Sequence, residues 1–228
     1  MKERVALTPK SERSRERILQ AALSLFAERG FQGTTMRDIA GRAEVSLGLT
    51  YRYFARKEDL AVALYEEMSE ALLFQAQNLY GGTIGERFGV LMRASIEHLE
   101  AHRGAFLALA ARAFDPADDI GVLGSATATI RERARAGMSA LVDGADDAPA
   151  GPQERADLAD ALYTADLLLV LIWTQDKDPE RRATHDAIAA AVELVGAARP
   201  LLATFFGAST LARVAGVAGR LGIGRRAE

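Results

Sequence analysis

The sequence predicts an all-α protein, with a three-helix N-terminal unit joined to a larger helical body. Apolar residues recur at helical spacing along most of the 228 residues, and no segment alternates apolar and polar residues as a half-buried strand does. Ser and Thr caps at helix starts, with Gly and Pro between segments, divide this pattern into helices. Since 49% of the residues are hydrophobic and 26% are charged, the composition excludes a disordered chain.

The first helix is predicted at about residues 14–29, after a flexible arm at 1–12. Its apolar side chains form one stripe that faces a core, and Gly30 ends it as a C-terminal glycine. The stripe consists of Ile18, Ala21, Ala22, Leu25 and Phe26.

Two short helices follow and form a predicted helix-turn-helix at about residues 35–54. Thr35 and Asp38 have the spacing of a capping box, which begins a helix at 36–43. Ser46 is a suitable N-cap for the next helix, at 47–54. Two short helices joined by a three-residue turn are typical of DNA-binding proteins.

The rest of the chain is predicted to be helical as well. A connector helix at about 58–78 ends before a Gly81-Gly82 hinge, and Thr83 and Glu86 form a second capping box. Asp178, Pro179 and Glu180 have the order of an N-cap, an N1 proline and a first-turn acid. The expected later helices lie at about 84–102, 104–114, 119–142, 153–176 and 180–205. We expect residues 13–73 to form the DNA-binding domain, 74–206 a helical body, and 207–228 a basic Gly/Ala-rich tail, either a frayed helix or disordered.

The distribution of charge agrees with DNA binding by the N-terminal part. The net charge is −3, yet residues 1–60 hold 12 basic and 8 acidic residues, which leaves 16 basic and 23 acidic for the remainder. In a helix-turn-helix the second helix enters the major groove. Arg37 suits the O6 and N7 acceptors of guanine, and Lys57 can contact a phosphate. The full set of expected DNA-binding residues is Thr35, Arg37, Ser46, Leu47, Gly48, Leu49, Tyr51, Arg52, Tyr53 and Lys57.

These residues as a set resemble the N-terminal domain of the TetR/AcrR family of transcriptional regulators. The resemblance covers about residues 13–73 and rests on the order of its segments, which are 18–31, 34–43, 45–46, 51–54 and 57–58. It implies a homodimer that binds a roughly palindromic operator, usually as a repressor, until a small-molecule effector enters the C-terminal domain.

The chain departs from the family pattern at three places. The family often has Gly at the position of Glu44, so Glu44 would have to adopt a left-handed conformation. Leu49-Thr50-Tyr51 replaces Thr-Leu-Tyr, and Ala55-Arg56 replaces Pro-Ser. The first two differences affect the operator sequence that we expect rather than the fold.

The helices at 153–176 and 180–205 are the candidates for a dimer interface, although the same faces could pack inside one protomer. The second helix offers the small side chains of Ala187, Ala190, Ala191 and Ala198, together with Leu194. Large side chains that could line an effector pocket, or belong to the core, are Met92, Phe106, Phe114, Tyr163 and Trp173.

Other functional classes have little support. The chain has no Cys, no Gly-x-Ser-x-Gly elbow and no phosphate-binding loop, so we expect no enzyme and no cofactor. His98 and His102 have the spacing of two metal ligands, but solvated histidines explain them better, and no metal is expected. The apolar stretch at 161–173 is too short to span a membrane and is expected to be a buried helix. The absence of Cys agrees with a cytoplasmic protein. Two alternatives stay open: a helical ligand-binding protein or enzyme whose N-terminal unit is structural, and a DNA binder without an operator.

Overall fold

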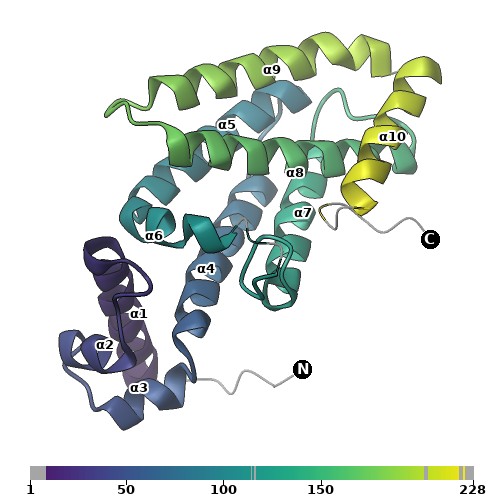
Figure 1. The fold of residues 1–228 in the computed structure, drawn as a ribbon. Helices are drawn as coiled ribbons and strands as arrows, with labels where there is room; N and C mark the ends of the chain where they lie inside the picture. Colours follow the sequence, from purple (N-terminus) through teal and green to yellow (C-terminus); the bar gives the residue numbers. More distant parts are fainter. Residues whose placement is uncertain (1–8, 114, 116, 203–204, 221–222, 224–228) are drawn as a thin grey trace. The chain divides into compact units, whose positions relative to one another are not determined.

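The computed structural model describes residues 9–113, 115, 117–202, 205–220 and 223, and within helices it leaves out the side chains of 199–208. Over these ranges the chain is helical and contains no strand, which confirms the all-α class (Figure 1). The helices form two compact units. The first holds α1–α3, α4 as far as Glu66, α6 and the segment from there to Ala126; the second holds the rest of α4, α5 and the described residues from Thr127 on.

The first unit is built around α1. Helix α1 (Pro9–Arg29) packs against α2 (Met36–Arg42), α3 (Leu47–Tyr53) and α6 (Arg103–Ala113), and α4 (Lys57–Gln77) leads out of the unit. Fully buried side chains of these helices make the core, namely Ile18, Phe26, Ile39, Leu60 and Leu109. We expected the segment of α6 to belong to the C-terminal body. It packs on α1 instead, because Gly104 lets the backbone approach so closely that a Cβ there would be 2.5 Å from Cβ of Ala27.

The second unit is a bundle of longer helices. It contains α5 (Ile84–Glu100), α7 (Ala128–Asp143), α8 (Pro152–Gln175), α9 (Arg182–Leu202) and α10 (Phe205–Arg220). Helix α8 packs against α7, α9 and α10, and α5 packs against α9. The α5–α9 contact depends on Gly89, where a Cβ would lie 2.7 Å from Cγ2 of Val192.

Four local capping signals predicted from the sequence are confirmed. Gly30 has φ 75° at the end of α1, and both capping boxes, at Thr35 and Thr83, are complete. The Ser46 side chain accepts a hydrogen bond from the Leu49 N–H at 3.1 Å. Each signal joins residues three or four apart, so it forms whatever the rest of the chain does.

Two helix starts differ from the prediction. Helix α1 begins at Pro9 rather than near residue 14, because proline suits the first helical position and a polar stretch can continue the helix. Helix α7 begins at Ala128 rather than at 119. The Asp118 carboxylate accepts the Ile120 N–H at 3.1 Å, and a Cβ on Gly124 would lie 2.1 Å from the Asp119 carbonyl oxygen, so residues 117–124 form turns and a short 3₁₀ helix, Ser125–Thr127, leads into α7.

The start of α9 also differs. The helix begins at Arg182, and the cap is not Asp178 but Asp176, whose carboxylate accepts the Thr184 N–H at 2.9 Å and the Thr184 hydroxyl at 2.8 Å. Asp178 instead accepts the Glu180 N–H at 2.8 Å, within the turn that precedes the helix. These hydrogen bonds hold the pKa of Asp176 below its ordinary value.

The predicted tail at 207–228 is helical as far as Arg220, where α10 ends. The remainder of the tail, apart from residue 223, lies outside the described residues, as do residues 1–8 of the predicted arm. None of the described helices combines the length and the apolar character needed to cross a membrane.

Candidate DNA-binding surface

The turn between α2 and α3 is held by contacts to its backbone. Glu44 has φ 52°, so the left-handed conformation expected at this position is present. The Arg17 guanidinium of α1 donates to the carbonyl oxygens of Ala43 and, at 3.3 Å, of Glu44. The turn therefore keeps a fixed geometry although a residue with a Cβ occupies the strained position.

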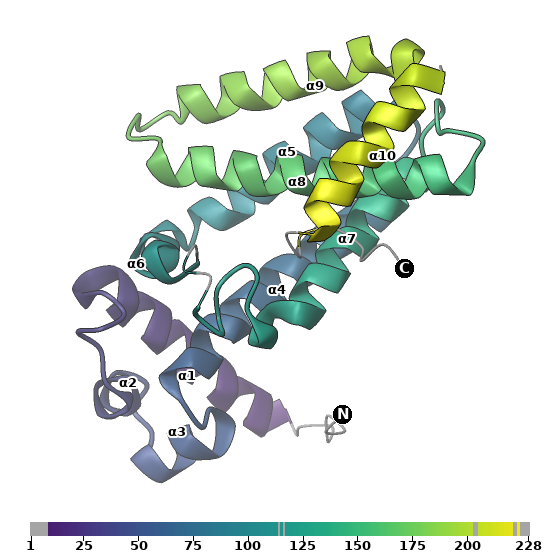
Figure 2. The ribbon, with the colours of Figure 1, turned by 45° about the vertical axis from the view of Figure 1, so that its right-hand side comes forward.

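One face of α3 is buried and the opposite face is exposed. Thr50 and Phe54 are 0% and 3% exposed and join the core, whereas Tyr51 is 50% exposed. Figure 2 shows α2 and α3 beside α1. Among the predicted DNA-binding residues, the exposed ones are Thr35, Arg37, Ser46, Gly48, Tyr51 and Arg52, and the half-buried ones are Leu47, Leu49, Tyr53 and Lys57.

Two hydroxyl groups of this set also have structural partners. The Thr35 hydroxyl donates to the Asp38 carboxylate at 2.5 Å within the capping box, and the Tyr53 hydroxyl lies 2.6 Å from Oγ of Ser11. Arg37 and Arg52 are exposed cations on α2 and α3, each long enough to reach beyond the helix surface. The helix-turn-helix thus presents two guanidinium groups, hydroxyls and the open backbone at Gly48 on its exposed face.

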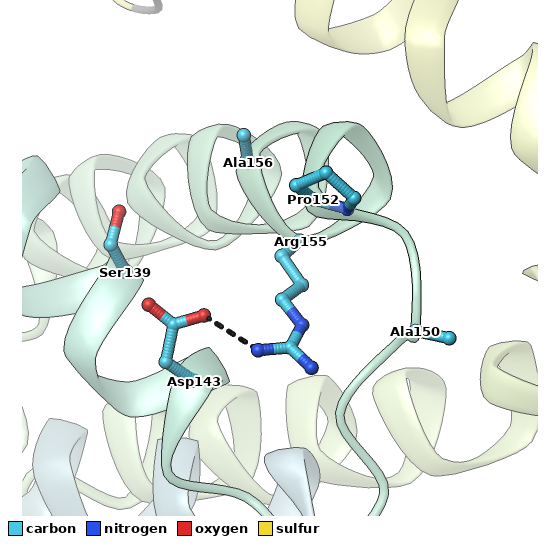
Figure 3. A pocket seen from close by; sticks show the side chains of 6 residues that line it. All are labelled: Ser139, Asp143, Ala150, Pro152, Arg155 and Ala156. Carbon is cyan, nitrogen blue, oxygen red and sulfur yellow. Dashed lines mark hydrogen bonds and ion pairs between the residues drawn. The ribbon is translucent and has the colours of Figure 1, made fainter.

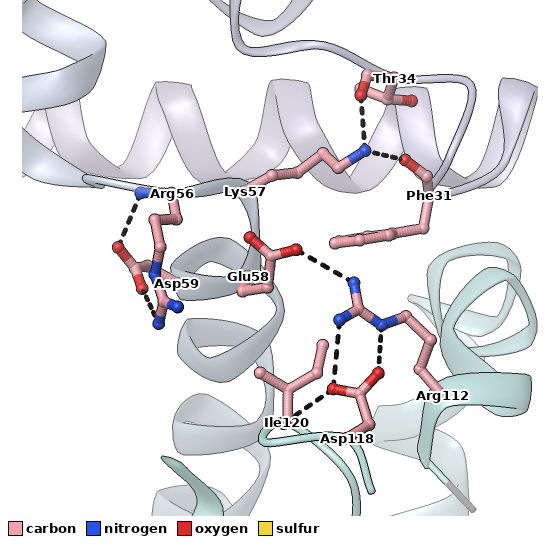
Figure 4. Close-up of polar contacts among 9 residues, drawn as sticks. All are labelled: Phe31, Thr34, Arg56, Lys57, Glu58, Asp59, Arg112, Asp118 and Ile120. Carbon is pink, nitrogen blue, oxygen red and sulfur yellow. Dashed lines mark hydrogen bonds and ion pairs between the residues drawn. The ribbon is translucent and has the colours of Figure 1, made fainter. Parts of the chain in front are cut away.

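Lys57 is placed differently from the prediction. Its ammonium group donates to the carbonyl oxygens of Phe31 and, at 2.8 Å, of Thr34, and it lies 4.3 Å from the centre of the Phe31 ring (Figure 4). Burial lowers the pKa of this amine. The group that we expected to bind a phosphate therefore joins the start of α4 to the turn after α1 in this structure.

Sequence reasoning missed the cluster around Arg112. Its guanidinium is 4.6 Å from the Phe31 ring centre, contacts Asp118 at 2.6 and 3.1 Å, and contacts Glu58 at 3.1 Å (Figure 4). The bond to Arg112 holds the pKa of Asp118 below its ordinary value. The cluster links the turn after α1, α4, α6 and the segment after α6. Arg112 and Asp118 are 6 positions apart, but every other pair of its members is separated by 27 to 87 positions, so no sequence motif could indicate it.

The five predicted pocket residues do not form one group. Phe106 is in the first unit and packs on Tyr65, with ring centres 5.9 Å apart. Met92, Tyr163 and Trp173 are buried in the second unit, and the Trp173 indole N–H donates to Glu100 at 2.7 Å. Phe114 lies outside the described residues.

Two hollows of the second unit lie away from these side chains. One, of about 370 Å³, is lined by α7 and α8 and contains the ion pair between Asp143 and Arg155 at 3.4 Å (Figure 3). The other, of about 700 Å³, follows the turn between α4 and α5 and includes Tyr80 and Arg93. His98 and His102 are half-buried, and the described residues contain no group of three His, Cys, Asp or Glu arranged to hold a metal ion.

Comparison with known proteins agrees with this geometry. Residues 18–64 match the family model for bacterial regulatory proteins of the tetR family. The chain is 36% identical over 90 residues to the HTH-type transcriptional repressor KstR2 of Mycobacterium tuberculosis, covering 39% of this chain and 45% of that one. It is 47% identical over 55 residues to the repressor Rv3405c of the same species, covering 24% and 29%. The chain thus spans less than half the length of these curated relatives.

Solved structures are similar over more of the chain. A tetR-family transcriptional regulator from Streptomyces coelicolor has a TM-score of 0.59 at 20% identity, covering 89% of this chain and 88% of that one. FadR from Bacillus subtilis, in complex with stearoyl-CoA, has a TM-score of 0.56 at 17% identity, covering 78% and 97%. At these identities the likeness shows the fold alone.

Proposed function

The chain belongs to the TetR family of bacterial regulatory proteins through its N-terminal helix-turn-helix, and we propose that it is a repressor that binds a palindromic operator as a homodimer. The observation that carries this proposal is the exposed face of α2 and α3, where Arg37, Tyr51 and Arg52 extend from a rigidly capped turn. Such a face can enter a major groove, with Arg37 reading a guanine and the other two side chains contacting phosphates. The protein acts on chromosomal DNA in the cytoplasm and catalyses no reaction.

Selection of bound sequences from a random duplex pool tests the DNA-binding part. We expect a palindromic consensus, and titration of that duplex should give a lower Kd than random DNA of equal length at every salt concentration. Equal affinity for both duplexes would favour a binder without an operator. No duplex binding at low salt would refute the regulator and favour a structural N-terminal unit.

For the dimer we propose the face formed by α8 and α9. Leu168, Ile172 and Leu194 are 57%, 38% and 71% exposed, and the predicted small residues Ala187, Ala190, Ala191 and Ala198 lie along α9. Apolar side chains this exposed favour contact with a second copy, and two-fold dimers are the commonest assembly. Leu194→Glu should produce monomers in sedimentation velocity. Leu107→Glu, at an apolar side chain 43% exposed on α6, is the matched control and should leave the dimer intact.

For the effector we propose a small molecule bound by the helical part of the chain after residue 73. Helix α4 continues from the DNA-binding unit into the second unit, with the division between Glu66 and Glu67. A tilt of α4 would change the distance between the two copies of α3, the recognition helix of each protomer, and this distance must match half-sites about 34–36 Å apart. Because FadR was solved with stearoyl-CoA, a long-chain acyl-CoA is a suitable first probe. If an effector still released the operator from a dimer whose two helix-turn-helix units are crosslinked at constant separation, this mechanism would be excluded.

A further inference from the structure

After Pro9, the first two turns of α1 hold polar residues only and precede the segment, 18–64, that matches the family model. They are nevertheless fixed to the recognition helix. The Ser11 hydroxyl is 2.6 Å from the Tyr53 hydroxyl, and the Arg15 guanidinium lies 5.1 Å from the centre of the Phe54 ring. Both contacts reach the C-terminal end of α3.

The spacing along α1 explains this attachment. At about 100° per residue, Ser11, Arg15 and Ile18 fall within an arc of about 60° of the helix. Ile18 is fully buried and belongs to the core stripe, so the two polar residues continue that stripe beyond the core. The first turns of α1 are thus attached to the end of α3 by a hydrogen bond and a cation–π contact rather than by apolar burial.

A different face of the same turns is basic. Lys10, Arg13 and Arg17 fall within another arc of about 60°, which does not include Glu12 or Glu16. All three cations are exposed. The basic stripe, as we name these three residues, is long enough to follow a DNA backbone over more than one phosphate.

The members of the basic stripe differ in their partners. Arg17 donates to carbonyl oxygens of the helix-turn-helix turn and lies 3.9 Å from the Glu44 carboxylate, so part of its charge is already balanced. Arg13 donates through Nε to the Pro9 carbonyl oxygen, and in the described part of the chain neither Arg13 nor Lys10 is in an ion pair. Lys10 and Arg13 therefore keep their full charge for an anionic partner.

We propose that the basic stripe forms a second DNA contact, in which Lys10 and Arg13 bind backbone phosphates that flank the half-site read by α3. Ser11 is the positioning residue of this contact, because its hydrogen bond to Tyr53 fixes the stripe relative to the recognition helix. This inference rests on the proposed function. The second contact increases the affinity for DNA and its dependence on salt without adding sequence preference, as phosphate contacts do.

The test measures the slope of log K against log salt for the full-length protein on its selected operator. Removing two phosphate contacts should reduce the magnitude of the slope by about 1.8 per subunit, so Lys10→Ala/Arg13→Ala should show this loss with an unchanged consensus. The matched control, Arg93→Ala/Lys177→Ala, removes two exposed cations from the second unit and should keep the wild-type slope. Phosphate ethylation should interfere with wild-type binding at the flanking positions and lose this effect in the Lys10/Arg13 variant.

Ser11→Ala should weaken operator binding on the order of fivefold, the equivalent of one hydrogen bond, and Tyr53→Phe should add little to that loss. A wild-type slope for the Lys10/Arg13 variant, or interference confined to the half-sites, would overturn the second contact while leaving the proposed function intact. Failure of the wild-type protein to bind any duplex would overturn both. Circular dichroism at each salt concentration checks that the variants are folded.

Discussion

Asp166 lies in the most apolar part of α8 and is only 6% exposed. Burial raises the pKa of this carboxyl to about 7, whereas an unfolded chain would release the proton near pH 4. A raised carboxyl pKa means that the folded state binds the proton more tightly than the unfolded state. Stability is therefore lost as the pH rises from about 4 to about 7 and is constant above that range. We predict that Asp166→Asn, which has a similar shape and no charge to desolvate, stabilises the protein at neutral and alkaline pH.

The size of the effect follows from the difference between the two pKa values. Three pKa units at 1.36 kcal/mol each give a gain of about 4 kcal/mol in the free energy of unfolding above pH 8. At pH 5 the folded state is protonated and the unfolded state is largely ionised, so the gain should be less than half as large. The expected signature is a gain that more than doubles from pH 5 to pH 8.

Urea unfolding followed by far-ultraviolet circular dichroism measures this gain at pH 5, 6, 7 and 8. A single protomer concentration is needed, because dimerisation couples stability to concentration. Glu97→Gln removes an exposed carboxylate of α5 and should give no gain that depends on pH in this range. If Asp166→Asn gave the same change at pH 5 and pH 8, burial would not be the reason for the perturbed carboxyl, and the reasoning would fail.

Four further predictions concern single side chains. Glu44→Gly should raise the free energy of unfolding by about 1 kcal/mol, because glycine takes the left-handed conformation without strain; a loss measured in urea would contradict this. Arg37→Ala should cost about 1–3 kcal/mol of operator affinity and relax one base position in binding to a panel of single-base variants, whereas a uniform loss across the panel would exclude base reading. Lys57→Met should destabilise the fold by about 2 kcal/mol through lost charged hydrogen bonds and keep the salt slope of binding, so a slope smaller by about one would restore its phosphate role. Asp176→Asn should lower the free energy of unfolding at pH 7, because the folded state stabilises the ionised Asp176 carboxylate and so lowers its pKa. Wild type should lose this stability on acidification and the variant should not, so parallel acid unfolding curves for the two proteins would count against the cap at Thr184.

The helix-turn-helix could be predicted from the sequence because its signals are local. The capping box at Thr35, the N-cap at Ser46 and the terminator at Gly30 each join residues at most four apart. The left-handed turn at Glu44 was expected from the resemblance to the family pattern, which often has Gly at this position, and φ 52° confirms it. The capping interactions depend on neighbouring residues alone, so the exposed residues of α2 and α3 could be named in advance.

Two predicted helix starts were wrong because other carboxylates, two and eight positions from their partners, accept the backbone N–H groups instead. Asp178-Pro179-Glu180 looked like a cap, but Thr184 takes the Asp176 carboxylate. The helical spacing of apolar residues at 119–142 looked continuous, but the Asp118 carboxylate accepts a turn hydrogen bond, and residues 117–124 form turns instead of helix. In both cases more than one carboxylate lies near the same N–H groups in the sequence, and the path of the backbone determines which carboxylate accepts the hydrogen bond.

The sequence by itself determined the helical class, the helix-turn-helix and its exposed cations, because periodicity and capping act within one or two turns. Only the tertiary structure decided that Lys57 turns inward to the Phe31 and Thr34 carbonyls, that α6 packs on α1, and that Ser11 meets Tyr53 across 42 positions. A long flexible cation or a hydroxyl has many partners of similar energy in an unfolded chain. Its partner is settled only when packing of the apolar core brings distant backbone and side-chain groups within hydrogen-bonding distance.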